Sequence, residues 1–252
     1  MPLAATPASD ATPATDVRAL TFDVFGTVVD WRTSVIRECQ ELAARKGIPA
    51  EQSGDWGAFV DDWRYDGYMG GIGRVRRGEL PFQTADALHR AKLDALLADR
   101  GIELTEAEVD DLNKAWHRLD PWPDSVAGLE RLRTRFTVST LSNGNVGLLV
   151  NMAKRSGLGW DCVLSAEVTG AFKPEPQCYL RAAELLGLQP NQVMMVAAHQ
   201  RDLQAAQSVG FRAAFIPRPD EAGPNREVDL TPDPAFDFVA PGLDDLARQL
   251  GC

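Results

Sequence analysis

Five short apolar segments, separated by longer stretches with helical patterns, constrain the fold of this chain more than any other feature. These segments are rich in β-branched and apolar residues and lie at 17–23, 136–141, 162–166, 192–198 and 211–216. Alternation of short strands with helices is typical of parallel sheets whose crossover connections are helical. Runs with no polar alternation, such as VMMVAA in the fourth segment, suit strands that are covered on both faces. The sequence therefore predicts an α/β fold around a parallel sheet.

A long stretch between the first two segments is too large to be a single crossover. Four parts of it have helical character, at 34–46, 57–69, 85–99 and 106–119. The segment LDPWPDS at 119–125 contains two prolines, which end regular structure and return the chain to the sheet. We therefore predict a helical cap domain at 33–121, inserted into a core domain that is made of 17–32 together with 122–252.

Charge and cysteine content exclude several classes of function. The chain has 26 Lys and Arg against 36 Asp and Glu, and the resulting net charge of -10 repels phosphate backbones and anionic membrane surfaces. We expect neither nucleic acid nor a membrane as a partner. The four cysteines have no paired spacing typical of zinc or redox sites, so we expect reduced thiols in a cytoplasmic protein; they are Cys39, Cys162, Cys178 and Cys252. Residues 1–16 are rich in proline and small polar residues, which predicts a disordered tail.

Polar residues follow four of the predicted strands. Because ligands bind beyond the carboxyl ends of the strands in an open parallel sheet, these residues are the candidates for a site. They are Asp23, Gly26 and Thr27 in DVFGT, Ser142 and Asn143 in LSNGN, Lys173 in FKPEP, and His199 and Asp202 in AAHQRD. Each residue alone is also consistent with an ordinary role, since such residues commonly cap the next helix and a lone lysine is commonly a surface charge.

The order and spacing of these four motifs resemble those of the haloacid dehalogenase superfamily. The resemblance extends from residue 19 to residue 215, and it implies a Rossmann-like core with a helical cap and a covalent nucleophile at Asp23. Most members are magnesium-dependent phosphatases with a second aspartate at the position of Phe25, and a phenyl ring cannot transfer a proton. A further metal-binding aspartate is expected where this chain has Ala198, and a hard divalent cation requires oxygen ligands. Both differences argue against phosphoryl transfer.

Within the superfamily, the chain is most similar to the (S)-2-haloacid dehalogenases, also called L-2-haloacid dehalogenases. These enzymes use no metal or other cofactor and have an aromatic residue at the position of Phe25. Arg64 resembles their halide-contacting arginine, although an ordinary surface arginine on an amphipathic helix is the alternative. Tyr179 matches a tyrosine near the substrate carboxylate. The fourth motif departs from their SSNxxD pattern, because His199 stands where the family has asparagine.

The resemblance implies a two-step hydrolysis of a short 2-haloacid. Asp23 would displace the halide with inversion at C2 and form an aspartyl ester, and Lys173 would keep that carboxylate ionised. Water would then hydrolyse the ester, with Asp202 as the first choice for the base and His199 as a possible partner. The remaining implied roles are substrate binding by Thr27, Ser142, Asn143, Tyr179 and Phe25, and halide binding by Arg64 and Asn143.

Two alternatives remain open from the sequence. One is a magnesium-dependent small-molecule phosphatase of the same superfamily that tolerates Phe25 and Ala198. The other is a non-catalytic binding protein that keeps the fold without turnover. The expected partner in the leading hypothesis is a small halogenated carboxylic acid, and a homodimer is compatible with the resemblance.

Overall fold

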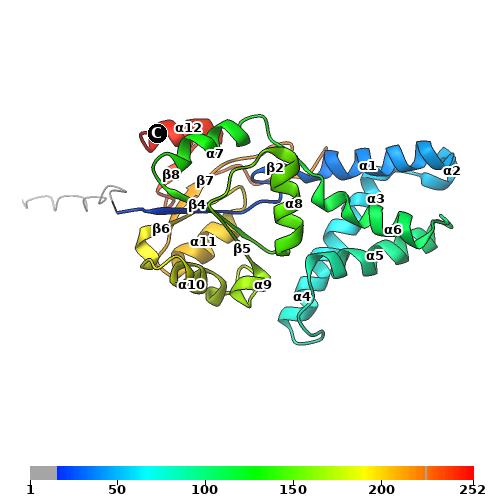
Figure 1. Ribbon diagram of the computed structural model, residues 1–252, viewed down its shortest axis with the longest axis horizontal. Helices are drawn as coiled ribbons and strands as arrows, with labels where there is room; N and C mark the ends of the chain where they lie inside the picture. Colours follow the sequence, from blue (N-terminus) through cyan, green and yellow to red (C-terminus); the bar gives the residue numbers. More distant parts are fainter. Residues whose placement is uncertain (1–15, 225) are drawn as a thin grey trace, which may run out of the picture.

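The computed structural model describes residues 16–224 and 226–252, and it is built around a six-stranded parallel sheet (Figure 1). The strand order is β5-β4-β1-β6-β7-β8. The strands are β1 (Ala19–Phe22), β4 (Thr137–Ser142), β5 (Cys162–Ser165), β6 (Val193–Ala197), β7 (Arg212–Phe215) and β8 (Phe238–Val239). The predicted α/β class and the five predicted strands are confirmed, whereas the predicted tail lies outside the described residues up to residue 15.

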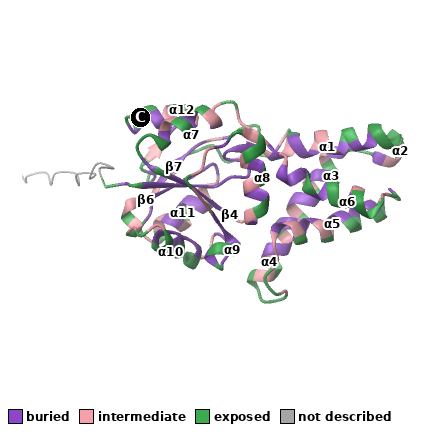
Figure 2. Ribbon diagram, viewed as in Figure 1, coloured by how far each residue is buried: buried purple, intermediate pink, exposed green. Residues whose placement is uncertain are grey.

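The central position of β1 determines where the candidate site forms. Phe22, the last residue of β1, is in register with Thr140 on one side and with Val196 on the other. The segments that follow β1, β4 and β6 therefore leave the sheet at the same edge. All residues of β1 and β6 are buried, as predicted from their continuous apolar character (Figure 2).

Helices cover both faces of the sheet and produce two apolar clusters. In Figure 1, α7 and α12 lie above the sheet and α9, α10 and α11 lie below it. The helices of the core are α7 (Ser125–Arg133), α8 (Val146–Ser156), α9 (Ala166–Thr169), α10 (Pro176–Leu185), η3 (Pro190–Gln192), α11 (Gln200–Ser208) and α12 (Leu243–Gln249). One apolar cluster joins α7, α8 and α12 to the insertion, and the other packs α10 and α11 against the opposite face.

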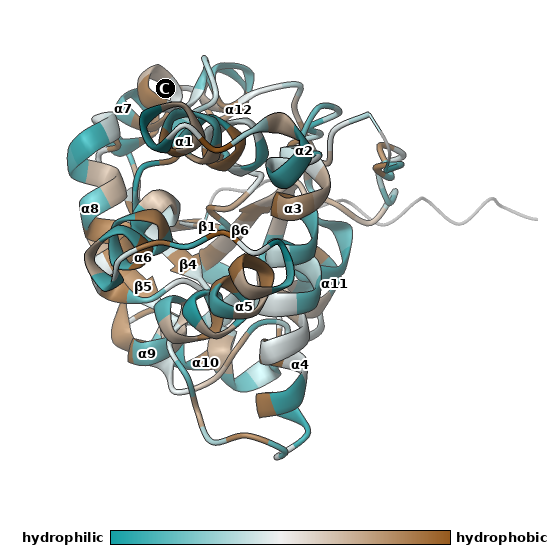
Figure 3. Cartoon of the chain, turned by 90° about the vertical axis from the view of Figure 1, so that its right-hand side faces the viewer, coloured by the Kyte–Doolittle hydropathy of each residue, from teal (hydrophilic) through white to brown (hydrophobic). Residues whose placement is uncertain are grey.

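The insertion after β1 is helical and lies over the carboxyl ends of the strands. Figure 3 looks along the sheet from the right of Figure 1 and shows α3, α5 and α6 in front of β1, β4 and β6. The chain enters and leaves the insertion through the antiparallel pair β2 (Val29–Asp30) and β3 (Asp120–Pro121). The helical segments are α1 (Trp31–Lys46), α2 (Ala50–Ser53), α3 (Trp56–Asp62), η1 (Trp63–Met69), α4 (Gly70–Arg76), α5 (Ala85–Asp99), α6 (Glu106–Asn113) and η2 (Lys114–His117). The domain boundaries 33 and 121 stay a prediction, and α1 begins two residues before the first of them.

Local sequence explains where two of these helices begin, and one predicted helix contains a π-helical segment. Asp30 accepts a hydrogen bond from the backbone N–H of Thr33 at the start of α1, and Thr105 and Glu108 form a capping box at the start of α6. The predicted helix at 57–69 is longer than expected, since α3 continues through the π-helix η1 into α4 without a break. π-Helical turns are frequent at functional sites, and η1 carries Arg64.

Three further observations concern strand β8, the cysteines and the length of the helices. The two-residue strand β8 was not predicted, because its sequence is too short to have a strand pattern. Cys39, Cys162, Cys178 and Cys252 are all free thiols. Across residues 16–224 and 226–252, the helices are all too short or too polar to cross a lipid bilayer.

Candidate active site

Asp23 immediately follows β1, is only 7% exposed and accepts hydrogen bonds at both carboxylate oxygens. Lys173 Nζ lies 2.9 Å from Oδ1, while Thr27 Oγ1 lies 2.9 Å and His199 Nδ1 lies 2.8 Å from Oδ2. Burial alone would raise the pKa of Asp23, but the charges of Lys173 and His199 outweigh burial and hold this pKa well below its ordinary value. The side chain is therefore an ionised carboxylate at neutral pH.

The turn after Asp23 depends on Gly26. Its φ of +86° is a left-handed conformation that residues with a Cβ rarely adopt. A Cβ at this position would also lie 2.1 Å from Glu221 Oε1. Thr27 then donates its hydroxyl proton to Asp23 and accepts from the backbone N–H of Ala198 at 2.9 Å, which joins the ends of β1 and β6.

Lys173 is shared between two buried carboxylates. Its ammonium group contacts Asp23 and forms a short hydrogen bond with Asp202, and its side chain is 6% exposed. Burial opposes the charge of Lys173, but Asp202 and Asp23 raise its pKa above the ordinary value, so it stays protonated. The other oxygen of Asp202 accepts the hydroxyl of Tyr179. Burial and the charge of Asp23 raise the pKa of Asp202, although Lys173 acts in the opposite direction.

His199 joins Asp23 to a second acidic residue, Glu221. Its Nδ1 lies 2.8 Å from Asp23, and its Nε2 lies 2.9 Å from Glu221 Oε1. Burial would lower the pKa of His199, but Glu221 and Asp23 raise it to about 10. In the resting state the imidazole is thus a cation that donates to both carboxylates. Glu221 is 6% exposed and also accepts from Trp31 Nε1 at 3.2 Å.

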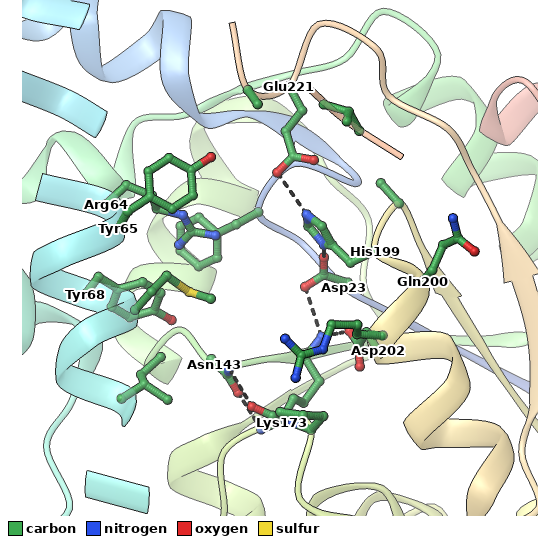
Figure 4. Close-up of a pocket in the computed structure, with 18 of the residues that line it drawn as sticks. Asp23, Arg64, Tyr65, Tyr68, Asn143, Lys173, His199, Gln200, Asp202 and Glu221 are labelled. Atoms are coloured by element: carbon green, nitrogen blue, oxygen red, sulfur yellow. Dashed lines mark hydrogen bonds and ion pairs between the residues drawn. The ribbon is translucent and has the colours of Figure 1, made fainter. Parts of the chain in front are cut away.

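These side chains face a cavity of about 640 Å³ between the sheet edge and the insertion (Figure 4). Asp23, Lys173, His199 and Asp202 lie on one side of it, and Arg64 and Tyr68 of η1 lie on the other. Its wall includes Asp23, Phe25, Arg64, Tyr65, Tyr68, Met69, Ile72, Arg76, Asn143, Lys173, Ala198, His199, Arg201, Asp202, Glu221 and Arg226.

Arg64 is a buried cation without an anionic partner in the part of the chain that the structure describes. Its side chain is 7% exposed, and its guanidinium carbon lies 5.0 Å from the ring centre of Phe25, 5.3 Å from Trp31 and 5.0 Å from Tyr68. Its Nη1 has no hydrogen-bond partner among the described residues. Aromatic faces stabilise a guanidinium only partly, and buried charges in proteins are normally paired. The arrangement is therefore suited to hold an anion delivered by a ligand.

A comparison with known protein families identifies the family to which the chain belongs. The sequence profile of the haloacid dehalogenase-like hydrolase family matches residues 17–210. The chain is a haloacid dehalogenase-like hydrolase.

Among its relatives, this hydrolase is similar to several dehalogenases over most of its length. It is 27% identical to an (S)-2-haloacid dehalogenase of Xanthobacter autotrophicus, over 92% of this chain and 94% of that protein. It is 32% identical to (S)-2-haloacid dehalogenase 4A of Burkholderia cepacia, over 80% of this chain and 84% of that protein. Its structure superimposes on that of a defluorinating L-2-haloacid dehalogenase with a TM-score of 0.88, at 44% identity, covering 94% of this chain and 96% of the other. A second L-2-haloacid dehalogenase structure gives 0.86 at 43% identity, covering 93% and 100%.

Most of the predicted site residues lie together around the cavity. The ordinary roles considered for some of them do not fit, because Lys173 and Arg64 are buried and His199 makes no side-chain cap at the start of α11. The hydrogen-bond network around Asp23 contains Thr27, Lys173, Tyr179, His199 and Asp202, and the cavity wall also contains Phe25, Arg64 and Asn143.

Ser142, Thr27 and Tyr179 do not line the cavity, although each was expected to bind substrate. The hydroxyl of Ser142 is buried and accepts from the backbone N–H of Gly144 at 3.1 Å. Asn143 lies on the wall, and its amide group holds the backbone of Lys173 through Oδ1 at 2.8 Å and Nδ2 at 3.2 Å. Its side chain therefore fixes the loop that presents the lysine.

Glu221 is the site residue that the sequence analysis missed. It lies in PRPDEAG, six positions beyond the end of β7 and therefore outside the four motifs, the last of which is AAHQRD. The signal that identifies it is position, since β7 is parallel to β6 and its following loop leaves at the same sheet edge.

Proposed function

We propose that this hydrolase removes the halogen from short 2-haloacids through a covalent ester on Asp23. The observation that carries the proposal is an ionised, buried carboxylate that faces, across one cavity, a buried guanidinium whose Nη1 has no partner among the described residues. The first group is suited to attack an electrophilic carbon, and the second to receive the anion that leaves. The names of the similar enzymes, (S)-2-haloacid dehalogenases, support the same reaction.

In the first step, a carboxylate oxygen of Asp23 bonds to C2 while the carbon–halogen bond breaks on the opposite side. The halide leaves with the bonding electron pair toward Arg64 and Asn143, so configuration at C2 inverts. Two negative charges about 4 Å apart repel by about 4 kcal/mol at an effective dielectric near 20. Lys173 and His199, the two cations on Asp23, offset the repulsion between this carboxylate and that of the substrate.

The cavity wall carries charges of both signs in a protein whose net charge is -10. Arg76, Arg201 and Arg226 line the same cavity as the catalytic groups, and so do Glu227 and Asp229. The arginines supply donors that can pair with an anionic substrate. Phe25 contributes an apolar ring beside Asp23, which limits the access of water to the nucleophile before substrate binds.

In the second step, water attacks the ester carbon of Asp23 and a base takes its proton. The bond from this carbon to the substrate oxygen then breaks, and the 2-hydroxy acid leaves with the proton that the base returns, which restores the carboxylate. Both oxygens of Asp202 are already engaged by Lys173 and Tyr179, which favours a positioning role for this residue. His199 is better placed, because ester formation removes one of its two anionic partners. Its pKa then falls, and its side chain, 40% exposed, can release a proton to solvent. Glu221 keeps Nε2 protonated and leaves Nδ1 free to accept from water.

The charge of Asp23 should therefore control the pKa of His199. In the Asp23→Asn variant, which mimics the uncharged ester, we expect this pKa to fall from about 10 toward neutrality. Titration of the imidazole signals by NMR measures it directly, since the chain has only three histidines. A pKa that stays at the wild-type value would show that Glu221 alone sets the charge, and His199 would then be excluded as the base.

The Arg64→Met variant should distinguish the role of Arg64 in halide departure from its contribution to the stability of the fold. Because Arg64 is buried without a carboxylate partner in the described structure, a similar-sized apolar side chain should leave the free energy of unfolding unchanged or raise it. Turnover should fall by roughly 100-fold to 1000-fold, as when one charge-stabilising donor is removed. Urea unfolding and halide release measure the two effects. A strongly destabilised variant with normal turnover would contradict the proposed role.

Two measurements test the proposed function itself. Halide release is measured with chloro-, bromo- and fluoroacetate and with both enantiomers of 2-chloropropionate, and we expect only the S enantiomer to react, giving the inverted 2-hydroxy acid. A single turnover in heavy-oxygen water should place the label in Asp23 and not in the product. Label in the first product molecule would refute the ester. Phosphate release that requires magnesium, without any halide release, would instead establish a phosphatase.

A further inference from the structure

Asn145 and Asp86 form a reciprocal pair of hydrogen bonds between the core and the insertion. Nδ2 of Asn145 donates to Asp86 Oδ2 at 2.9 Å, and the backbone N–H of Asp86 donates to Asn145 Oδ1 at 3.3 Å. Asn145 ends the LSNGN motif and directly precedes α8, whereas Asp86 lies in the first turn of α5. An asparagine before a helix commonly caps that helix, but this side chain makes no cap on α8. It caps a helix of the insertion instead.

The carboxylate of Asp86 accepts hydrogen bonds at both oxygens. Besides the bond from Asn145, Oδ1 accepts from Nε2 of His117 on η2 at 2.9 Å. Asn145 and His117 are each 8% exposed, so water competes little for these bonds. Burial would raise the pKa of Asp86, but the hydrogen bond from His117 lowers it below its ordinary value, and the carboxyl group stays ionised at neutral pH. Because hydrogen bonds to an ionised acceptor are stronger than those to a neutral one, this contact holds the insertion in a defined position.

On the insertion side, the helix that carries Asp86 also supports Arg64. His89 lies one turn after Asp86 on α5, and its ring stacks on that of Tyr68 with 4.5 Å between the ring centres. The backbone carbonyl of His89 accepts from Trp63 Nε1 at 2.8 Å. Trp63 and Tyr68 both belong to η1 and flank Arg64 along the chain. The position of α5 therefore determines where η1 places Arg64 over the cavity.

On the core side, Asn145 belongs to the loop that presents Lys173. Asn143, two residues earlier, holds the backbone of Lys173 through both atoms of its amide group. Lys173 in turn contacts Asp23 at 2.9 Å. The bonds between Asp86 and Asn145 thus join the supports of the two cavity walls. In a displacement reaction, a misplacement of about 1 Å can reduce the rate by about 100-fold.

We propose that Asp86 and Asn145 are positioning residues for dehalogenation, whose paired hydrogen bonds fix the distance between Asp23 and Arg64 across the cavity (Figure 4). The inference rests on the proposed function and adds two residues that do not line the cavity. They act through the loop that holds Lys173 and through α5, and they contact neither the substrate nor the reacting atoms.

The test exchanges the two residues. Asp86→Ala and Asn145→Ala each remove the side-chain bond, whereas the double variant Asp86→Asn with Asn145→Asp still places one amide opposite one carboxylate. Asp94→Ala is the matched control, because Asp94 lies on the same helix, is 52% exposed and pairs with Arg90 on the surface. Urea unfolding identifies conditions in which each variant is folded, and halide release from bromoacetate then gives kcat and KM. Asp86→Asn alone replaces Asp86→Ala if the alanine variant does not fold.

We expect each alanine variant to lower kcat by about 10-fold to 100-fold with KM changed by about 3-fold or less, because correct positioning lowers the energy of the transition state. The exchanged double variant should return kcat to within about 3-fold of wild type, and Asp94→Ala should stay within about 2-fold. Wild-type kcat in both alanine variants, or a double variant no faster than they are, would overturn the inference.

Hydrogen–deuterium exchange gives a readout that does not depend on turnover. In Asp86→Ala, peptides that cover 84–89 and 142–147 should both exchange about 10-fold faster, and both should return to the wild-type rate in the exchanged double variant. Faster exchange at 84–89 alone would show that the contact does not link the two parts, which would also overturn the inference. A wild type that releases no halide but shows the linked exchange would refute the proposed function and leave the structural link established.

Discussion

The Asp23→Asn variant is expected to release halide at least on the order of 10⁴-fold more slowly than wild type, because it lacks the carboxylate that we propose as the nucleophile. The two carboxylates nearest to it are already engaged, Asp202 by Lys173 and Tyr179 and Glu221 by His199 and Trp31. Steady-state halide release with bromoacetate, the substrate with the best leaving group, gives the largest measurable range.

Two controls make this result specific. Asp66→Asn removes a carboxylate that is 73% exposed on η1, and its turnover should stay within about 2-fold of wild type, as expected for a surface change. Halide binding by Asp23→Asn, followed through tryptophan fluorescence, should remain, since Arg64 is unchanged. Residual turnover within 10-fold of wild type would mean that water attacks the substrate directly.

The Lys173→Met variant should lose both stability and activity. Removal of this ammonium leaves Asp23 and Asp202 as two buried carboxylates without their shared cation, and breaking a buried ion pair in this way costs about 3–5 kcal/mol. Turnover should fall sharply as well, because the pKa of Asp23 rises and the nucleophile is partly protonated. Urea unfolding at pH 7 and halide release measure the two losses.

The pH dependence of the stability loss in Lys173→Met distinguishes a charge effect from a general packing defect. Without Lys173, the pKa values of the Asp23 and Asp202 carboxyl groups in the folded variant are higher than in the unfolded chain. The variant is therefore most stable at a pH below the unfolded pKa values, where both groups are protonated. Its free energy of unfolding falls as the pH rises through the folded pKa values. In wild type the lowered pKa of Asp23 has the opposite effect, since its contribution is lost as pH falls. The difference in stability between variant and wild type should thus narrow from pH 7 to pH 4. Lys173→Met combined with Asp202→Asn should recover part of the loss at pH 7, and a constant difference across this range would contradict the charge explanation.

The sequence predicted the sheet, the helical insertion and the position of Asp23, because these depend on local patterns. Short continuous apolar runs between helical segments suit strands covered on both faces, and Asp23, Lys173, His199 and Asp202 meet because parallel strands end at one edge. Directions of side chains were not predictable in the same way. Ser142 and Tyr179 follow the expected motifs, yet both turn away from the cavity, since a motif specifies a position along the chain and not a rotamer.

Pairings between distant parts of the chain were also beyond the sequence patterns. The contact of Glu221 with His199 joins two loops with no common motif. Tyr68 and Arg64 are four positions apart on η1, so they lie on the same side of this helix. Their burial beside the cavity depends on how the insertion packs, and no spacing along the chain indicates it.

The close approach of Glu221 to Gly26 links two positions that are far apart in the chain. An ideal Cβ at residue 26 would lie 2.1 Å from Glu221 Oε1, so a side chain at this position would require the Glu221 carboxylate to shift. That carboxylate contacts Nε2 of His199, and its shift would therefore change the environment of the imidazole. A glycine in the turn after β1 thus leaves room for an acid that reaches His199 from a distant loop.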